Sequence, residues 1–294
     1  MKVELTTAEA ARGLFSNSPF GSSLSHAADA ITLVLDRDGA ATGVLQLERL
    51  AFDSELFGVS SARINVLTAQ SEADYTALLA ACQSECRARG VRHVVRRMPV
   101  GQFAETWGLA GAGYRLVDVS VLFERAVAAS GSSSAESSRF RVRPVEPAEA
   151  AALAARYAAA FTLTRFAVDP FVSVAAALEL HRRWIVNSCQ GRADAVLVAD
   201  VGSELLGFIT CRLDQATATG CIELVAVDAA QRGAGIGRGL VGAALTWFAG
   251  RAERVQVRTQ LNNSIAVGLY QASGFRLLLG ELTYAWMDEA KDPQ

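Results

Sequence analysis

The sequence predicts an α/β fold in two parts, and three observations support this prediction. Residues 221–275 read as strand, glycine-rich loop, helix, strand and helix in succession. Residues 126–138 are rich in serine and alanine and lack any apolar period, which is typical of a linker. The chain has 294 residues, of which 51% are hydrophobic, enough for two cores. We therefore expect one domain at 1–125 and a second at 139–294.

The elements of the second part follow from their residue patterns. Each expected strand is a short β-branched or apolar run between turn residues, and each expected helix has apolar residues three or four positions apart. Asparagine before the last helix and Gly274 after it are typical start and stop residues. In order, we expect strand 140–145, helices 147–161 and 173–188, strands 195–199, 205–212 and 221–228, helix 239–250, strand 254–260, helix 262–275 and strand 281–287.

The first part contains a weaker copy of this ending. Residues 92–116 align without a gap to residues 253–277, and both read strand, helix, Gly-aromatic-Arg-Leu, strand. A helix at 75–90 precedes the first copy, as another precedes the second. The first copy has TAQSEA (68–73) where a glycine loop would stand. Its counterparts of Asn263 and Tyr270 are Gln102 and Leu109, so we expect it not to bind the ligand of the glycine loop. Its expected role is that of a scaffold, a substrate wall or an extension of the sheet.

The glycine-rich loop QRGAGIGRGL (231–240) is the strongest motif. Glycines that lead into a helix let backbone N–H groups approach a phosphate. The spacing fails the dinucleotide pattern G-x-G-x-x-G, because the sixth positions from Gly233 and Gly235 are Arg238 and Leu240. A P-loop needs G-K-[ST], and no lysine is near. R-G-x-G-x-G fits the pyrophosphate arm of coenzyme A, and an ordinary glycine-rich turn is the alternative.

With these residues the chain resembles the GNAT superfamily of N-acetyltransferases. The resemblance rests on LVAVDAAQRGAGIGRGLV (224–241) and on Asn263, Ala266, Tyr270, Gly274 and Phe275. It implies the GNAT fold, a mixed and mostly antiparallel sheet flanked by helices, preceded here by a smaller, degenerate half-GNAT α/β domain. It also implies acetyl-CoA as the cofactor. Many members have Gln or Arg where this chain has Ala230, and Arg232 occupies the other common register.

The resemblance also implies which residues contact acetyl-CoA. The strand before the loop offers backbone groups to the pantetheine arm, and an N–H near Val225 would stabilise negative charge on the thioester oxygen. The loop and the helix start would hold the pyrophosphate. The implied cofactor-binding residues are Leu224, Val225, Ala226, Val227, Arg232, Gly233, Ala234, Gly235, Ile236, Gly237, Arg238, Asn263, Ala266 and Tyr270.

Two residues are the catalytic candidates. Tyr270 can protonate the departing sulfur as a general acid, with a core aromatic as the alternative role. Glu223 shares strand parity with Val225 and Val227, so we expect it to face the cleft as a base. His181 ranks below Glu223, and water can replace both because a sugar amine is partly neutral near pH 7. We assign no metal ligands.

The acceptor is predicted from a second resemblance. Residues 50–64 and 161–191 resemble stretches of the TDP-fucosamine acetyltransferases, which acetylate the 4-amino group of a TDP-linked 4-amino-4,6-dideoxygalactose. The signals are Asp53, Leu56, Phe57, Gly58, Arg165, Phe166, Trp184, Asn187 and Gly191. Arg165 is a candidate phosphate ligand, and Phe166, His181 and Trp184 are candidates for a sugar pocket. Antibiotics, polyamines and protein N-termini remain alternative acceptors, and a non-catalytic coenzyme A-binding regulator is the alternative class.

Composition excludes several other classes. The net charge is −2 and basic residues are scattered, which argues against a nucleic-acid partner. No apolar run reaches about 18 residues, so we expect no membrane span. Five cysteines without a C-x-x-C pair indicate reduced thiols in a cytoplasmic protein. The expected partner is a small-molecule amine, and a homodimer stays open.

Overall fold

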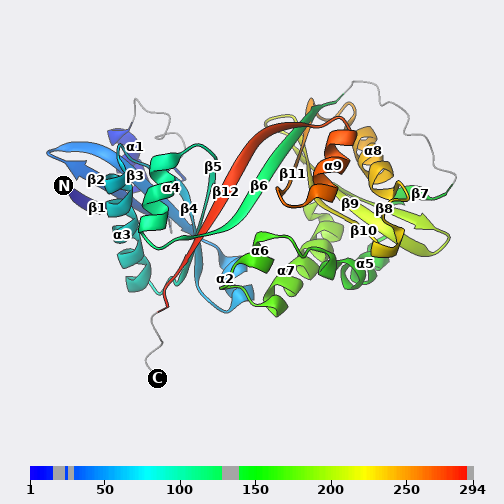
Figure 1. The fold of residues 1–294 in the computed structure, drawn as a ribbon, viewed down its shortest axis with the longest axis horizontal. Coiled ribbons are helices and arrows are strands. Elements are labelled where there is room, and N and C mark those ends of the chain that lie inside the picture. The colour runs from blue at the N-terminus through cyan, green and yellow to red at the C-terminus, as the bar shows by residue number, and fades with distance from the viewer. Residues whose placement is uncertain (16–23, 26–29, 128–138, 290–294) are drawn as a thin grey trace. The chain divides into compact units, whose positions relative to one another are not determined.

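The computed structural model describes residues 1–15, 24–25, 30–127 and 139–289, and these fall into two compact units (Figure 1). The first unit consists of Met1–Asp118, Val168–Ser173 and Glu281–Gln294, and the second of Val119–Ala167 and Val174–Gly280. Neither unit is continuous in sequence, so the units do not coincide with a division at 126–138. Most of that expected linker, residues 128–138, lies outside the described residues.

The first unit is built on a mixed sheet. Neighbouring strands are antiparallel except β4 and β5, which run parallel. Helices α3 and α4 pack together (Figure 1) and bury Leu78, Leu79 and Leu109 in one core with the sheet. In sheet order the strands are β1 (Lys2–Thr6), β2 (Ile31–Arg37), β3 (Ala40–Arg49), β4 (Ser61–Thr68), β5 (His93–Pro99) and the end of β12 (Arg276–Met287). The helices are α1 (Ala8–Leu14), α2 (Ala51–Phe57), α3 (Glu72–Ala88) and α4 (Phe103–Gly111).

The second unit has a sheet covered on both faces. Helices α8 and α9 form one core with it, α5 and α7 another, and Figure 1 shows the two pairs on opposite sides. In sheet order the strands are the end of β6 (Arg115–Ala126), β11 (Arg254–Gln260), β10 (Thr219–Val227), β9 (Glu204–Asp214), β8 (Ala195–Val201) and β7 (Arg141–Pro144). The helices are α5 (Ala150–Tyr157), α6 (Arg165–Val168), α7 (Val174–Asn187), α8 (Ile236–Phe248) and α9 (Ser264–Ala272). Each element predicted for residues 140–287 is present, and the helix predicted at 147–161 is shortened to α5 with a 3₁₀ turn at each end.

The two sheets repeat one pattern. Each has three antiparallel pairs, then one parallel pair, then a last antiparallel strand, from β1 to β12 in the first unit and from β7 to β6 in the second. The last strand of each sheet comes from the opposite half of the sequence. Residues 281–287 of β12 pair with β5, and residues 120–126 of β6 pair with β11. The two halves of the sequence therefore exchange the last strands of their sheets, β6 and β12.

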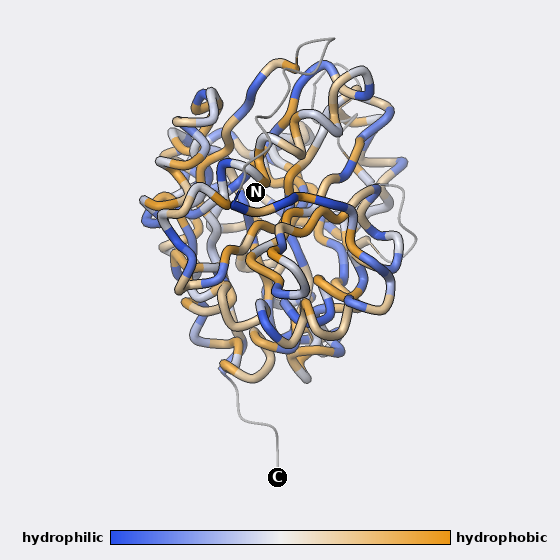
Figure 2. Tube along the Cα trace, turned by 90° about the vertical axis from the view of Figure 1, so that its right-hand side faces the viewer, coloured by the Kyte–Doolittle hydropathy of each residue, from blue (hydrophilic) through white to orange (hydrophobic). Residues whose placement is uncertain are grey.

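Hydropathy changes over short stretches along the trace (Figure 2), as expected of strands and helices with one buried face. In the part of the chain that the structure describes, no helix combines the length and the apolar character needed to cross a membrane.

Candidate active site

The second unit contains a cavity of about 520 Å³. Its walls come from the segment after α5, the end of β10, the loop before α8 with the first turn of that helix, the end of β11, and α9. The lining residues are Ala160, Phe161, Thr162, Leu163, Thr164, Val225, Ala226, Val227, Gln231, Arg232, Gly233, Gly235, Ile236, Gly237, Arg238, Gln260, Asn263, Ile265, Ala266, Leu269 and Tyr270.

Strand β10 is irregular where it reaches the cavity. Between Ile222 and Val225 it has one residue more than its partner β9, which is a β-bulge. Among the described residues, its parallel register with β11 ends at Ile222. Residues 225–227 lie beyond that point and line the cavity. Backbone groups of this stretch that β11 does not use can therefore pair with an extended ligand.

The loop before α8 is shaped to approach an anion. Asp228 Oδ1 accepts a hydrogen bond from the Ala230 N–H at 3.0 Å and so fixes the start of the loop. Gly233 and Gly235 have φ of 83° and 86°, which glycine adopts easily. A Cβ atom on either would meet nothing within 4 Å, so both glycines face open space. Gly235 is the N-cap of α8 and offers no capping side chain, which leaves the N–H groups of residues 236–238 available to a ligand.

The charged side chains of the lining are all basic. Arg232 and Arg238 line the cavity, and within the described chain no Asp or Glu does. The partial positive charge at the start of α8 has the same sign. The cavity therefore attracts negatively charged ligands.

Tyr270 joins the cavity to the core of the second unit. Its ring packs at 6.2 Å from Phe123 and 5.9 Å from Phe275 between centroids, and the residue is only 4% exposed. Burial raises the pKa of Tyr270 well above the ordinary 10, so the phenol is protonated at neutral pH. Asn263 caps the same helix, its Oδ1 accepting from the Ala266 N–H at 3.1 Å. Tyr270 thus packs in the core, which is the alternative role considered from sequence, and it also lines the cavity.

The predicted position of Glu223 is wrong. Its side chain forms an ion pair with Arg212 at 3.4 Å and does not line the cavity. Strand parity places residues on one face only while the alternation is unbroken. The bulge between Ile222 and Val225 adds a residue and breaks it.

We expect Glu223→Gln to leave turnover within about threefold of the wild type. The carboxylate lies outside the cavity, and losing one exposed ion pair costs little stability. Steady-state rates of acetyl-CoA consumption measure this. A fall of a hundredfold would return Glu223 to the role of base.

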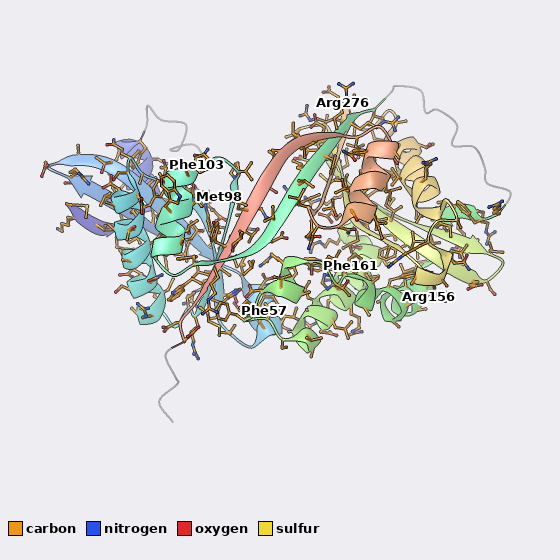
Figure 3. The ribbon with its side chains drawn as sticks, in the orientation of Figure 1. Phe57, Met98, Phe103, Arg156, Phe161 and Arg276 are labelled. Carbon is orange, nitrogen blue, oxygen red and sulfur yellow. The ribbon has the colours of Figure 1, made fainter. Side chains whose placement is uncertain are left out.

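The predicted acceptor residues form a cluster behind the cavity wall. His181 stacks on Phe161 with ring centroids 5.0 Å apart, and Phe166 and Trp184 meet His181 edge-on. The guanidinium of Arg165 lies 3.9 Å from the centre of the Phe166 ring. Of these five residues only Phe161, labelled in Figure 3, lines the cavity.

His181 is held as a neutral ring. Its Nδ1 lies 2.6 Å from the Ala177 carbonyl oxygen, to which it donates a hydrogen bond in the neutral tautomer. Burial lowers the pKa of His181. In the described chain its Nε2 is buried and has no hydrogen-bond partner. The ring therefore supports Phe161 from behind rather than facing a substrate.

The predicted cofactor-binding residues differ in whether they line the cavity. Leu224 and Ala234 do not line it, and the other twelve do. Leu224 packs in the core shared with α5 and α7, and its N–H donates to Thr210 Oγ1 at 2.9 Å. Sequence reasoning did not assign Ala160, Phe161, Thr162, Leu163, Thr164, Gln231, Gln260, Ile265 or Leu269 to the site. Gln231 belongs to the recognised loop, but the other residues carry no local motif.

Comparison with known proteins identifies this architecture. Residues 153–275 match the acetyltransferase (GNAT) family, and they contain the bulged strand, the glycine loop and Tyr270. This segment is similar to the GNAT acetyltransferases. The matched segment therefore includes all of the cavity lining described above.

A curated relative is similar to part of the chain. The spore coat polysaccharide biosynthesis protein SpsD of Bacillus subtilis (strain 168) is 31% identical over 140 residues, which are 46% of this chain and 47% of SpsD. The matched region thus spans about half the length of that curated relative.

Two solved structures have the same fold over nearly the whole chain. A GCN5-related N-acetyltransferase from Sphaerobacter thermophilus has a TM-score of 0.66 at 14% identity and covers 97% of this chain and 95% of its own. A tandem GNAT protein from the clavulanic acid biosynthesis pathway, without AcCoA, has a TM-score of 0.59 at 14% identity and covers 99% of each chain. The predicted fold class, a GNAT fold preceded by a GNAT-like α/β part, is confirmed.

GNAT acetyltransferases use acetyl-CoA. The residues present fit it. The N–H groups of residues 236–238 and the side chain of Arg232 would hold the pyrophosphate, because both face the cavity and carry positive charge. The open space above Gly233 and Gly235 leaves room for close approach. Residues 225–227 would pair with the amide groups of the pantetheine arm.

Proposed function

We propose that this protein is an N-acetyltransferase that moves the acetyl group of acetyl-CoA to the primary amine of a small molecule. The observation that carries the proposal is the single cavity in which an anion-binding helix start, a bulged strand and the buried phenol of Tyr270 meet. When bound, acetyl-CoA supplies the activated acetyl group. The alternative, a coenzyme A-binding regulator, gives no reason for a phenol at this position.

Three groups of the protein have separate roles in the proposed reaction. The backbone N–H of Val225 stabilises the negative charge that develops on the thioester oxygen as the amine attacks. The Tyr270 phenol, kept protonated by burial, donates its proton to the departing sulfur. The hydrophobic residues of the lining exclude water from the thioester.

The proton of the attacking amine goes to water in this proposal. The ionisable side chains in the described lining are Tyr270, Arg232 and Arg238, and all three are protonated at neutral pH. His181 lies behind Phe161. The acceptor amine therefore has to enter the cavity already neutral.

We expect kcat/KM for the acceptor to rise with pH, with its midpoint at the pKa of the acceptor's own amine and a plateau above it. The reason is that only the neutral amine has a free electron pair. The raised pKa of Tyr270 keeps the acid protonated, so no falling limb is expected below about pH 10. Initial rates between about pH 6 and 10, with two acceptors of different amine pKa, measure this. A midpoint that is the same for both acceptors would instead indicate a side-chain base.

We further propose that the acceptor is a nucleotide-linked amino-deoxy sugar of the TDP type. The described lining contains no carboxylate, which disfavours polycations such as polyamines and aminoglycosides as acceptors. Phe161, backed by the aromatic cluster, offers a flat apolar surface for a sugar ring. SpsD is, by its name, a protein of polysaccharide biosynthesis.

The cellular setting belongs to the same proposal. All five cysteines are free thiols, which supports a reducing, cytoplasmic location. A homodimer is compatible with the proposal and is not required by it.

A substrate screen tests this function. The protein is incubated with acetyl-CoA and one candidate amine, and release of free thiol is followed. The panel contains TDP- and UDP-linked amino sugars, the same sugars without nucleotide, aminoglycosides, polyamines and peptides. Thiol release with nucleotide-linked amino sugars above all others supports the proposal. Preference for a polycation or a peptide would overturn the acceptor class, and binding of acetyl-CoA without turnover of any amine would favour the regulator.

A further inference from the structure

The first unit contains a buried chain of polar groups that involves neither the cofactor cavity nor the glycine loop. His93 Nε2 lies 3.1 Å from Asp169 Oδ2, and His93 Nδ1 lies 3.2 Å from Ser61 Oγ. All three residues are at most 2% exposed. Buried polar groups without hydrogen-bond partners cost free energy, so these three side chains favour the arrangement in which they bond to one another.

These residue types also occur in nucleophilic hydrolases, but this chain of contacts is not such a site. Ser61 is fully buried, so no substrate reaches its hydroxyl group. The hydroxyl also lies 3.1 Å from the Val59 carbonyl oxygen, to which it can donate its proton. A nucleophile has to be accessible and to give its proton to the base. The contacts therefore hold the structure rather than perform chemistry.

Asp169 belongs to a segment that the first unit takes from the second half of the sequence. Residues Val168–Ser173 form part of the first unit, while the residues on either side of them belong to the second. The segment forms a tight turn in which Asp169 Oδ1 accepts from the Phe171 N–H at 3.0 Å. The Phe171 ring meets His93 edge-on at 6.2 Å, and Phe57 (Figure 3) meets it at the same distance. His93 is thus enclosed by the turn that it binds.

Chain connectivity links this turn to the cavity wall. Residues 160–164 line the cavity, and the short helix α6 joins them directly to the turn. The Ala167 N–H donates to the Thr164 carbonyl oxygen at 2.9 Å, so α6 continues from the last residue of the wall. After the turn, α7 carries His181, which supports Phe161. Along the chain, Asp169 therefore lies between the end of the wall and the helix that supports it.

We propose that His93 and Asp169 are positioning residues for the acceptor side of the active site. In this view the first unit, which lacks the glycine loop, takes part in the reaction by anchoring the turn at 168–173 and so limiting the motion of residues 160–164. The pair acts on acceptor binding and leaves cofactor binding unchanged. The kinetic part of this inference rests on the proposed acetyl-transfer function, and the structural part does not.

Hydrogen exchange of the full-length protein tests the structural part. Asp169→Ala removes the contacts to both His93 and the Phe171 N–H, and Asp169→Asn keeps an acceptor for the second. We expect Asp169→Ala to speed exchange of peptides from 160–173 about tenfold, and Asp169→Asn to speed it less. Peptides from α8 should exchange as in the wild type. The matched control is Glu179→Gln, which removes the ion pairs to Arg182 and Arg183 on α7 but leaves the turn intact.

Two results would overturn the proposal: unchanged exchange at 160–173 in the alanine variant, or an increase spread evenly over both units. If Asp169→Ala does not fold, the same two criteria apply to Asp169→Asn. The kinetic readout uses the acceptor found in the screen, for which we expect KM to rise about tenfold while KM for acetyl-CoA stays constant. A rise in both constants would contradict the positioning role. If no amine is acetylated, the function proposed above fails, while the exchange experiment still decides the anchor.

Discussion

Replacing Tyr270 with phenylalanine is expected to lower turnover by about 10²–10⁴, the usual contribution of a positioned proton donor. A thiol leaves fairly well unaided, so we expect the lower end of this range. Phenylalanine keeps the ring contacts with Phe123 and Phe275 and removes only the hydroxyl group. Affinity for acetyl-CoA should change little, because the lost proton acts on the departing sulfur. Single-turnover rates and a thermal shift with acetyl-CoA measure the two effects separately.

Tyr157 supplies the matched control. It is a buried tyrosine of the same unit, its hydroxyl donates to the Leu205 carbonyl oxygen at 3.1 Å, and it does not line the cavity. Tyr157→Phe should cost about 1 kcal/mol of stability and leave turnover unchanged. If Tyr270→Phe behaves in the same way, with a lower melting temperature and near-normal turnover, then Tyr270 is a packing residue and water or another group is the acid.

The second large effect concerns Gly235. Acetyl-CoA at a hundred times its Kd should stabilise the wild-type protein by about 2.7 kcal/mol, visible as a rise in Tm. We expect Gly235→Glu to abolish this rise. The glutamate side chain would enter the open space above the loop, its charge would repel the pyrophosphate, and the φ of 86° is unfavourable for it.

A variant at Gly250 separates a direct effect on acetyl-CoA binding from the effect of backbone strain. Gly250 has a φ of 72° and open space around its Cβ position, and it follows α8 at the end away from the loop. Gly250→Glu should lower the melting temperature of the free protein much as Gly235→Glu does. It should keep the full rise with acetyl-CoA. Equal rises in both variants would show that the loop before α8 is not the pyrophosphate site.

Most residues that local patterns assigned to the cofactor lie together in the cavity lining. The loop and the turn from strand to helix are specified within about ten residues, where glycine positions and the helix start act directly on the backbone. Twelve of the fourteen residues predicted there line the cavity. The two exceptions have local causes, since Leu224 lies within the bulged region and Ala234 lies between the two glycines that face open space.

The acceptor side was predicted less well, because its geometry depends on contacts that sequence spacing does not contain. The position of Glu223 depended on an unbroken alternation, and one inserted residue was enough to invalidate it. Residues Phe166, His181 and Trp184 lie together, but they pack against one another and leave Phe161 at the surface of the cavity. The pair His93 and Asp169 joins distant positions and leaves no local pattern.

The exchange of β6 and β12 has a consequence for how the chain is made. A ribosome delivers the first sheet up to β5 early, yet the strand that closes it emerges only after residues 100–280. Until then β5 presents a row of unpaired backbone groups, the condition in which nascent chains associate wrongly. Closure by such a distant strand also gives a high contact order, which slows folding. Nascent chains stalled before residue 281 should therefore depend on chaperones for solubility, and chains in which residues 281–287 have emerged should lose that dependence.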